Sequence, residues 1–190
     1  MVKMTKYIAA IYLIISFSIL SIAEEISDFE IEGISIGDSL LNYYKKSEIE
    51  NAIYTGAYKS DKFLMVTFLT PNDTYEALQF HVKKNDDKFK IYSISGQTKM
   101  SLKPCLKKRD KIIQELKGLF PKTKLLELDK REHPGYKNSY SYSTYFQFVS
   151  GDLIEIACYD YSPIVNKSAA DKLTVSLDTK EFNDFLTTAF

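Results

Sequence analysis

One amphipathic helix stands between two groups of strand-like segments, and this arrangement limits the possible folds more than any other feature. The helix is predicted over residues 101–120, where apolar side chains recur at helical spacing. The strand-like segments are 63–69, 75–83 and 88–95 before it, and 123–128, 139–149, 152–161 and 173–177 after it. Because strands and helices do not alternate regularly, we predict an α+β protein in which an antiparallel sheet carries helices packed on one face. Two loosely similar halves, each a helix followed by strands, are compatible with this order.

Capping residues predict three shorter helices. Asp38 or Ser39 is suited to begin the first. Ser47 with Glu50 three residues later has the pattern of a capping box and predicts the second. Thr179 precedes an apolar repeat and is expected to cap a closing helix.

The first 23 residues have the composition of a cleavable secretory signal peptide. Two lysines precede an uncharged run of 17 residues, 7–23, and Ser21 and Ala23 place small residues at positions −3 and −1 of a cleavage site. An uncleaved membrane anchor is the alternative, but a spanning helix needs about 20 apolar residues in a row. We therefore expect export to the periplasm with cleavage after Ala23, which leaves residues 24–190 as a single domain.

Cys105 and Cys158 are the only two cysteines in the chain. In an exported protein two cysteines are expected to form a disulfide, and the long loop closed here is worth about 3–4 kcal/mol in the chain-entropy model. Two buried free thiols are the alternative. The bridge would attach the start of the amphipathic helix to the sheet.

The charge distribution argues against general nucleic-acid binding, because 25 basic residues are balanced by 25 acidic ones. The central helix nonetheless carries a basic patch, Lys107, Lys108 and Lys111. We favour a solvated helix surface over contact with a membrane for this patch. Two distant histidines and two cysteines have no metal-ligand spacing, and no cofactor motif is present, so neither a metal nor a cofactor is expected.

Residues 139–161 are predicted to form a tyrosine-rich hairpin. We interpret Ser150-Gly151 as a two-residue turn. With that turn, four tyrosines lie on the face opposite Cys158, which itself points into the core. They are a candidate binding surface for a sugar, a peptide or a protein if that face is uncovered, and part of the core if a helix covers it. The four residues are Tyr140, Tyr142, Tyr159 and Tyr161.

Residues 37–40 spell Gly-Asp-Ser-Leu, which looks like the first block of the GDSL esterase family. In that family the serine of the block is the nucleophile, so the resemblance points to Ser39. Such a serine needs a histidine base that is oriented by a carboxylate. The family's Asp-x-x-His block is missing here, and only His81 and His133 are available. We favour a turn and helix cap, with a Ser39 ester hydrolase as the alternative.

The sequence of 29–53, together with 158–162 and 173–186, resembles a family of small exported proteins from marine alphaproteobacteria with small genomes. The family has no assigned activity. The resemblance implies a periplasmic location and brings no catalytic residue with it.

The sequence favours a non-enzymatic periplasmic domain that binds a small ligand or a periplasmic protein partner. Two alternatives stay open. One is the Ser39 ester hydrolase, and the other is a structural protein of the cell envelope whose basic helix faces the membrane.

Overall fold

The computed structural model describes residues 25–70, 74–167 and 169–189. The predicted signal peptide lies outside the described residues. Within them, an eight-stranded antiparallel sheet is combined with three α-helices, so the α+β class predicted from the sequence is confirmed. None of the described helices has both the length and the apolarity that crossing a membrane requires.

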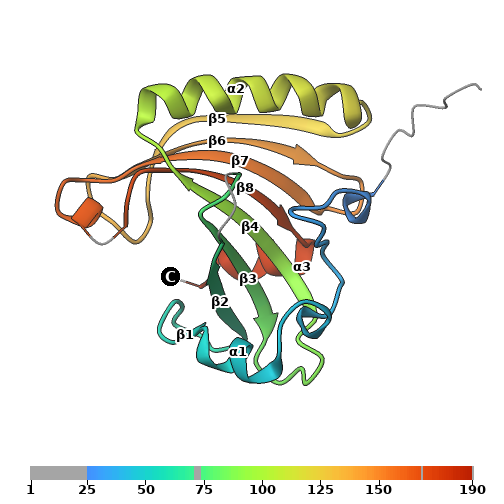
Figure 1. Cartoon of the computed structure of the whole chain (residues 1–190). Coiled ribbons are helices and arrows are strands. Elements are labelled where there is room, and N and C mark those ends of the chain that lie inside the picture. The colour runs from blue at the N-terminus through green and yellow to red at the C-terminus, as the bar shows by residue number, and fades with distance from the viewer. Residues whose placement is uncertain (1–24, 71–73, 168, 190) are drawn as a thin grey trace, which may run out of the picture.

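Two four-stranded meanders form the sheet and meet at its centre. The first contains β1 (Ile53–Tyr54), β2 (Phe63–Leu69), β3 (Ala77–Lys83) and β4 (Ile91–Lys99). The second contains β5 (Lys124–Glu132), β6 (Tyr140–Gln147), β7 (Leu153–Asp160) and β8 (Lys172–Asp178). The order is β1-β2-β3-β4-β8-β7-β6-β5, with β4 and β8 paired antiparallel. Figure 1 shows that the sheet is strongly bent, so the two meanders run in different directions.

One face of the sheet is apolar and carries most of the core. Residues two apart in a strand share a face, and the register aligns such residues into rows across the sheet. One row consists of Val66, Phe80, Ile94, Leu177, Ile154 and Phe146. All six are buried. Helix α2 (Leu102–Leu119) covers this face over β7 and β8 (Figure 1), and its Ile113 and Leu116 join the same core.

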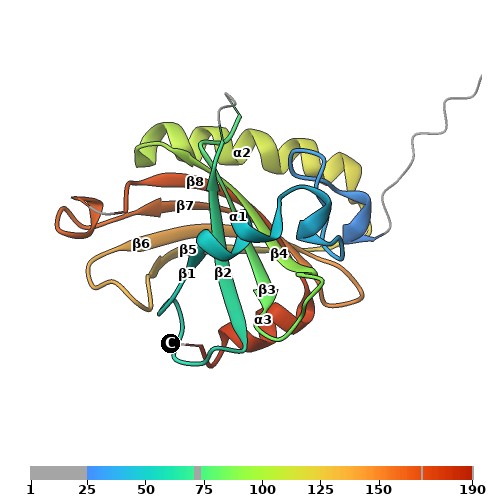
Figure 2. The same ribbon diagram turned by 60° about the horizontal axis from the view of Figure 1, so that its bottom comes forward.

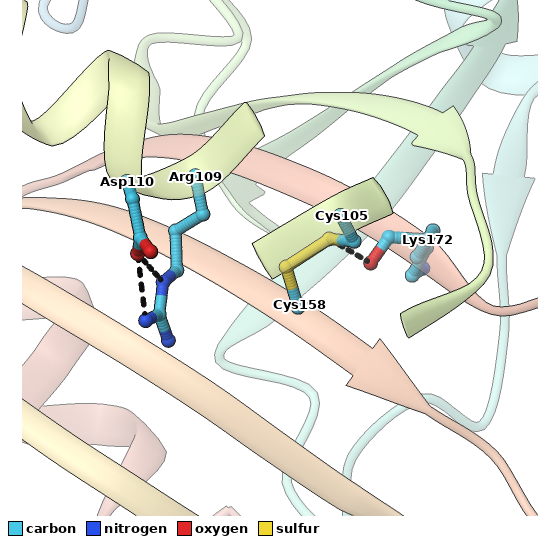
Figure 3. Close-up of a disulfide and its surroundings, with 5 residues drawn as sticks. All are labelled: Cys105, Arg109, Asp110, Cys158 and Lys172. Carbon is cyan, nitrogen blue, oxygen red and sulfur yellow. Dashed lines mark hydrogen bonds and ion pairs between the residues drawn. A yellow bond between two sulfur atoms is a disulfide. The ribbon is translucent and has the colours of Figure 1, made fainter. Parts of the chain in front are cut away.

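A disulfide attaches α2 to the sheet. The sulfur atoms of Cys105 and Cys158 are 2.03 Å apart, so the pairing expected from the sequence is present. Figure 3 shows the bridge running from the first turns of α2 to β7. The backbone carbonyl oxygen of Lys172 lies 3.8 Å from the sulfur of Cys105, so the bridge is next to the first residue of β8.

The segment before β1 covers the rest of the apolar face. It contains two 3-10 turns, η1 (Ile26–Asp28) and η2 (Leu40–Asn42), and helix α1 (Lys46–Asn51). The ring of Tyr44 stacks on Phe68 of β2 with ring centroids 3.8 Å apart, and Ile49 of α1 is fully buried. Figure 2 shows α1 in front of β2.

The closing helix α3 (Lys180–Leu186) packs on the opposite face of the sheet. Thr179 caps it as predicted, because its side chain accepts a hydrogen bond from the amide of Phe182. Phe182 and Phe185 contact Phe63 of β2, with ring centroids 5.3 and 5.0 Å apart. The expectation that the helices share one face therefore holds for α1 and α2 but not for α3. A short 3-10 turn, η3 (Val165–Lys167), connects β7 to β8.

The β6–β7 turn has three residues rather than the predicted two. The amide of Phe148 donates to the carbonyl of Asp152 at 3.0 Å, and Gly151 adopts a φ of +89°. A three-residue hairpin loop needs this left-handed conformation at its last residue, which glycine adopts at little cost. A shift of one residue turns every side chain of a strand to the other face. Tyr142 consequently pairs with Cys158 on the α2 face, so the prediction that the tyrosines lie opposite Cys158 is wrong for β6.

Candidate functional site

A cleft of about 410 Å³ opens on the sheet face opposite α2. Strands β3, β4, β8 and β7 form its floor. Phe182 and Leu186 of α3 line one side, and the loop after β1 lines another. His133 and Tyr136, from the turn between β5 and β6, contribute a further wall.

The floor of the cleft is polar because alternate residues of the two central strands are polar. Their polar side chains are Ser93, Ser95 and Gln97 on β4, and Lys172, Thr174, Ser176 and Asp178 on β8. The residues between them, such as Ile94 and Leu177, point into the apolar core. The hydroxyl of Ser176 donates to the hydroxyl of Ser95 at 2.9 Å, which joins the two strands across the cleft floor.

A chain of hydrogen bonds crosses the floor from Tyr58 to Asp178. The hydroxyl of Tyr58 lies 2.8 Å from Nε2 of His81, and the hydroxyl of Ser93 lies 3.1 Å from Nδ1 of the same ring. Ser93 is also hydrogen-bonded to the carboxyl group of Asp178. The ring of Phe182 stacks on His81 with centroids 4.3 Å apart.

The protonation state of the buried imidazole of His81 determines which groups donate and which accept in this series of hydrogen bonds. Burial lowers the pKa of His81 to about 3, so the ring is neutral and has one donor and one acceptor nitrogen. When Asp178 is ionised it can only accept. Tyr58 then donates to Nε2, Nδ1–H donates to Ser93, and Ser93 donates to the carboxylate. Protonation of Asp178 allows the whole chain to reverse.

Asp178 is one of the buried residues of the cleft floor and is 6% exposed. Burial raises the pKa of its carboxyl group to about 7, and the charge of Glu155 adds to this rise. The hydrogen bond with Ser93 opposes the rise. The group therefore changes charge near neutral pH.

Glu155 is a second acidic group of the cleft. It pairs with Ser176 in the β7–β8 ladder, two residues before Asp178, so the two carboxyl groups are diagonal neighbours on one face. Burial raises the pKa of Glu155, while hydrogen bonds with Ser143 and Tyr145 oppose this effect. Among the described residues, neither Glu155 nor Asp178 forms an ion pair.

The opposite end of β8 provides a cation and a group of aromatic rings. The ammonium group of Lys172 donates to Oε1 of Gln97 at 2.8 Å and lies 5.7 Å from the ring centroid of Tyr159. Burial lowers the pKa of Lys172. The rings of Tyr159 and Tyr161 are nearly parallel with centroids 5.9 Å apart, and His133 contacts both.

The four tyrosines of the predicted binding surface are divided between the two faces of the sheet. Tyr159 and Tyr161 line the cleft. Tyr142 packs against the core on the α2 face, and Tyr140 on the same face lies under the ammonium group of Lys130. The structure thus brings only half of the predicted surface into the cleft.

The basic patch lies away from the cleft. Lys107, Lys108 and Lys111 are exposed on α2, on the other side of the sheet. Lys111 forms an exposed pair with Glu115 one turn later, at 3.7 Å. Pairs of this kind contribute little to stability.

Ser39 occupies a turn at the start of η2. Its hydroxyl donates to the carbonyl of Lys88 at 2.5 Å and accepts from the amide of Leu41 at 3.3 Å. His81 makes its hydrogen bonds with Tyr58 and Ser93 instead. The geometry around Ser39 is that of the helix cap favoured from the sequence.

The described residues contain no group of three or more histidine, cysteine or acidic side chains placed to hold a metal ion. Comparisons with protein-family models, with curated proteins and with solved structures find no match to this chain. Support for a functional site therefore comes only from the geometry of the cleft residues.

Sequence reasoning missed most of the cleft. Ser93, Lys172 and Asp178 were not singled out, and His81 was considered only as a base for Ser39. A signal for them is present, because Lys-Leu-Thr-Val-Ser-Leu-Asp at 172–178 alternates polar and apolar residues without interruption. In a central strand this pattern places four polar side chains on one face, which normally requires water or a ligand beside it.

Proposed function

We propose that the protein is a periplasmic binding protein whose cleft holds a small polar ligand. The observation that carries the proposal is the polar row on β8, which lies at the centre of the sheet where a core would normally be apolar. Thr174, Ser176 and Asp178 are each at most 6% exposed. Burying polar groups lowers stability unless their hydrogen bonds are satisfied.

The hydroxyl of Thr174 supports this proposal most directly. It is buried and has no hydrogen-bond partner among the described residues, although it belongs to the cleft lining. Such groups are rare in native proteins because each one costs roughly 1–3 kcal/mol. A ligand with a donor or acceptor at this point would satisfy it.

Export is part of the proposal. The uncharged run at 7–23 and the disulfide support it, because disulfides persist in oxidising compartments. The resemblance to small exported proteins supports the same location. The Ser39 ester hydrolase has no comparable support, since the hydroxyl of Ser39 is held by Lys88 and Leu41.

The proposal is tested by identifying small molecules that stay bound to the purified protein. The purified protein is incubated with the low-molecular-mass fraction of a cell extract, separated by gel filtration and denatured, and released compounds are identified by mass spectrometry. We expect at least one compound from the wild type and none from Ser176→Leu, which fills the cleft floor. Lys111→Leu introduces the same side chain on the exposed surface of α2 and should retain the compound.

Circular dichroism and the intact disulfide establish that both variants are folded. Retention of the same compound by Ser176→Leu would place its binding elsewhere. If the wild type releases no compound, a ligand-binding role of the cleft is contradicted.

A further inference from the structure

The cleft contains two carboxyl groups that have no cationic partner in the described parts of the chain. Glu155 on β7 and Asp178 on β8 are diagonal neighbours on the cleft floor, and neither takes part in an ion pair within the described residues. A buried carboxylate without a partner is strongly unfavourable, whereas a well-placed cation stabilises it. The arrangement therefore favours a ligand that brings positive charge.

The described elements β3, β4 and α3 bring no cation to the two carboxyl groups. Strand β3 contributes His81, which is neutral, and β4 contributes the hydroxyl of Ser93. Helix α3 contributes the ring of Phe182, while its Glu181 faces Lys62 and Lys83 outside the cleft.

Aromatic side chains lie near the two carboxyl groups. Tyr58, Tyr145 and Tyr159 each interact electrostatically with Glu155 or Asp178, and the ring of Phe182 lines the cleft beside them. Burial, with a smaller contribution from the carboxyl groups, raises the pKa of Tyr58 and Tyr145, and the charge of Glu155 together with burial raises that of Tyr159, so the three phenols stay neutral. Neutral aromatic rings attract organic cations through their faces, and the attraction is strongest when water is excluded.

Thr174 is an independent indication that a ligand belongs in this cleft. Its buried hydroxyl lacks a partner among the described residues and lies on the same strand face as Asp178. The only cation on that face of β8, Lys172, is six residues from Asp178. At about 3.3 Å per residue their Cα atoms are about 20 Å apart, so the two ends of the cleft have opposite charge.

We propose that the cleft binds an organic cation, with the ammonium group of the ligand between Glu155 and Asp178 and the remainder extending along β8 towards Thr174. This inference rests on the proposed function and specifies its ligand class. The lysine at the far end disfavours a second positive group there, so the ligand has one cationic end and a neutral or anionic opposite end.

The experiment compares choline with 3,3-dimethylbutan-1-ol, which has the same shape but no charge. Binding of each to the purified protein is measured by calorimetric titration at pH 8, with glucose as a neutral polar probe. We expect choline to bind at least tenfold more tightly than the alcohol. Glu155→Gln and Asp178→Asn should each weaken choline binding at least tenfold, because each amide removes the charge at nearly constant shape.

Asp160→Asn is the matched control, since Asp160 is also on β7 but on the opposite face, and it should bind choline like the wild type. Affinity for choline should fall about tenfold from pH 8 to pH 6, because the ionised fraction of a carboxyl group with a pKa of about 7 falls about tenfold. Thermal unfolding of each variant verifies that it is folded.

Equal affinity for choline and the alcohol would overturn the cation proposal, as would choline binding that survives both substitutions. No choline binding at 50 mM would also overturn it. If glucose or the alcohol binds in the wild type and not in Ser176→Leu, the cleft remains a binding site and only the ligand class is wrong. If none of the three probes binds and no compound is captured from an extract, the proposed function fails as well.

Discussion

The same strands present an apolar row of side chains on one face of the sheet and a polar row on the other. On the α2 face, Phe80, Ile94 and Leu177 form part of a buried apolar row. On the cleft face, their neighbours His81, Ser93 and Asp178 form a row that is nearly as buried but polar. Apolar burial stabilises the fold at about 25 cal/mol per Å², whereas burial of polar groups opposes folding. The apolar face therefore accounts for most of the stability of the fold, and the polar face is the one to which we assign the proposed binding role.

The largest expected effect contrasts two adjacent residues of β3. Phe80→Ala should lower the free energy of unfolding by about 3–5 kcal/mol, because it removes a fully buried ring and leaves a cavity. Gln79→Ala on the cleft face should cost less than about 1.5 kcal/mol, since it loses mainly the hydrogen bond to Thr67 at 3.3 Å. Denaturant unfolding measures both values. Equal losses would show that the two faces contribute alike to stability.

The disulfide is expected to have the next largest effect. Replacing Cys105 and Cys158 by alanine together should destabilise the protein by about 3–4 kcal/mol, because the bridge closes a long loop in the unfolded chain. The bridge lies on the α2 face, so choline affinity of the variant, measured while it is folded, should stay within about twofold of the wild-type value. A loss of affinity as large as that expected for Asp178→Asn would mean that the two faces are tightly coupled.

Asp178 should make stability depend on pH. Its pKa is about 7 in the folded protein and about 3.9 in the unfolded chain. Between these values the folded state retains a proton that the unfolded state has released, so the free energy of unfolding falls as pH rises. We expect a loss on the order of 3–4 kcal/mol from this group between pH 4 and pH 8. Asp178→Asn cannot ionise and should show a shallower decline, measured by urea unfolding across this range. An unchanged decline would contradict the assignment.

The smallest expected effect concerns the basic patch. Lys111→Gln removes an exposed pair with Glu115 and should change stability by less than about 0.5 kcal/mol. Choline affinity should be unaffected, because Lys111 belongs to α2, which covers the other face of the sheet, and does not line the cleft. A change in affinity larger than twofold would extend the functional surface to α2.

Local periodicity predicted the elements well, whereas the capping box expected at Ser47 and Glu50 is wrong, because α1 begins at Lys46 with Lys45 as its N-cap. Strand β2 begins and ends at the predicted residues, α2 lies within the predicted 101–120, and Thr179 caps α3. The side of the sheet that each segment occupies was harder to predict, because it depends on loop length. One extra residue in the β6–β7 turn moved Tyr142 to the α2 face, and α3 reached the other face through its contact with Phe63.

The cleft could be predicted only in part for a related reason. Tyr159 and Tyr161 were expected on a binding surface, and both line the cleft. His81 and Asp178 are connected through Ser93 of β4, which lies between their strands. The pairing of β4 with β8 joins segments that are far apart in the sequence. The alternation of polar and apolar residues indicates that one face of a strand is polar. It does not indicate which strands lie beside it in the sheet.

The most direct test of a binding face opposite α2 is to map ligand contacts residue by residue. Amide chemical shifts of the isotope-labelled protein would be recorded by NMR during titration with choline at pH 8. The account predicts that the largest shifts fall in β8 and in the neighbouring residues of β4 and β7, with the amides of α2 nearly unchanged. Shifts centred on α2 and its basic patch, with 172–178 unaffected, would contradict it.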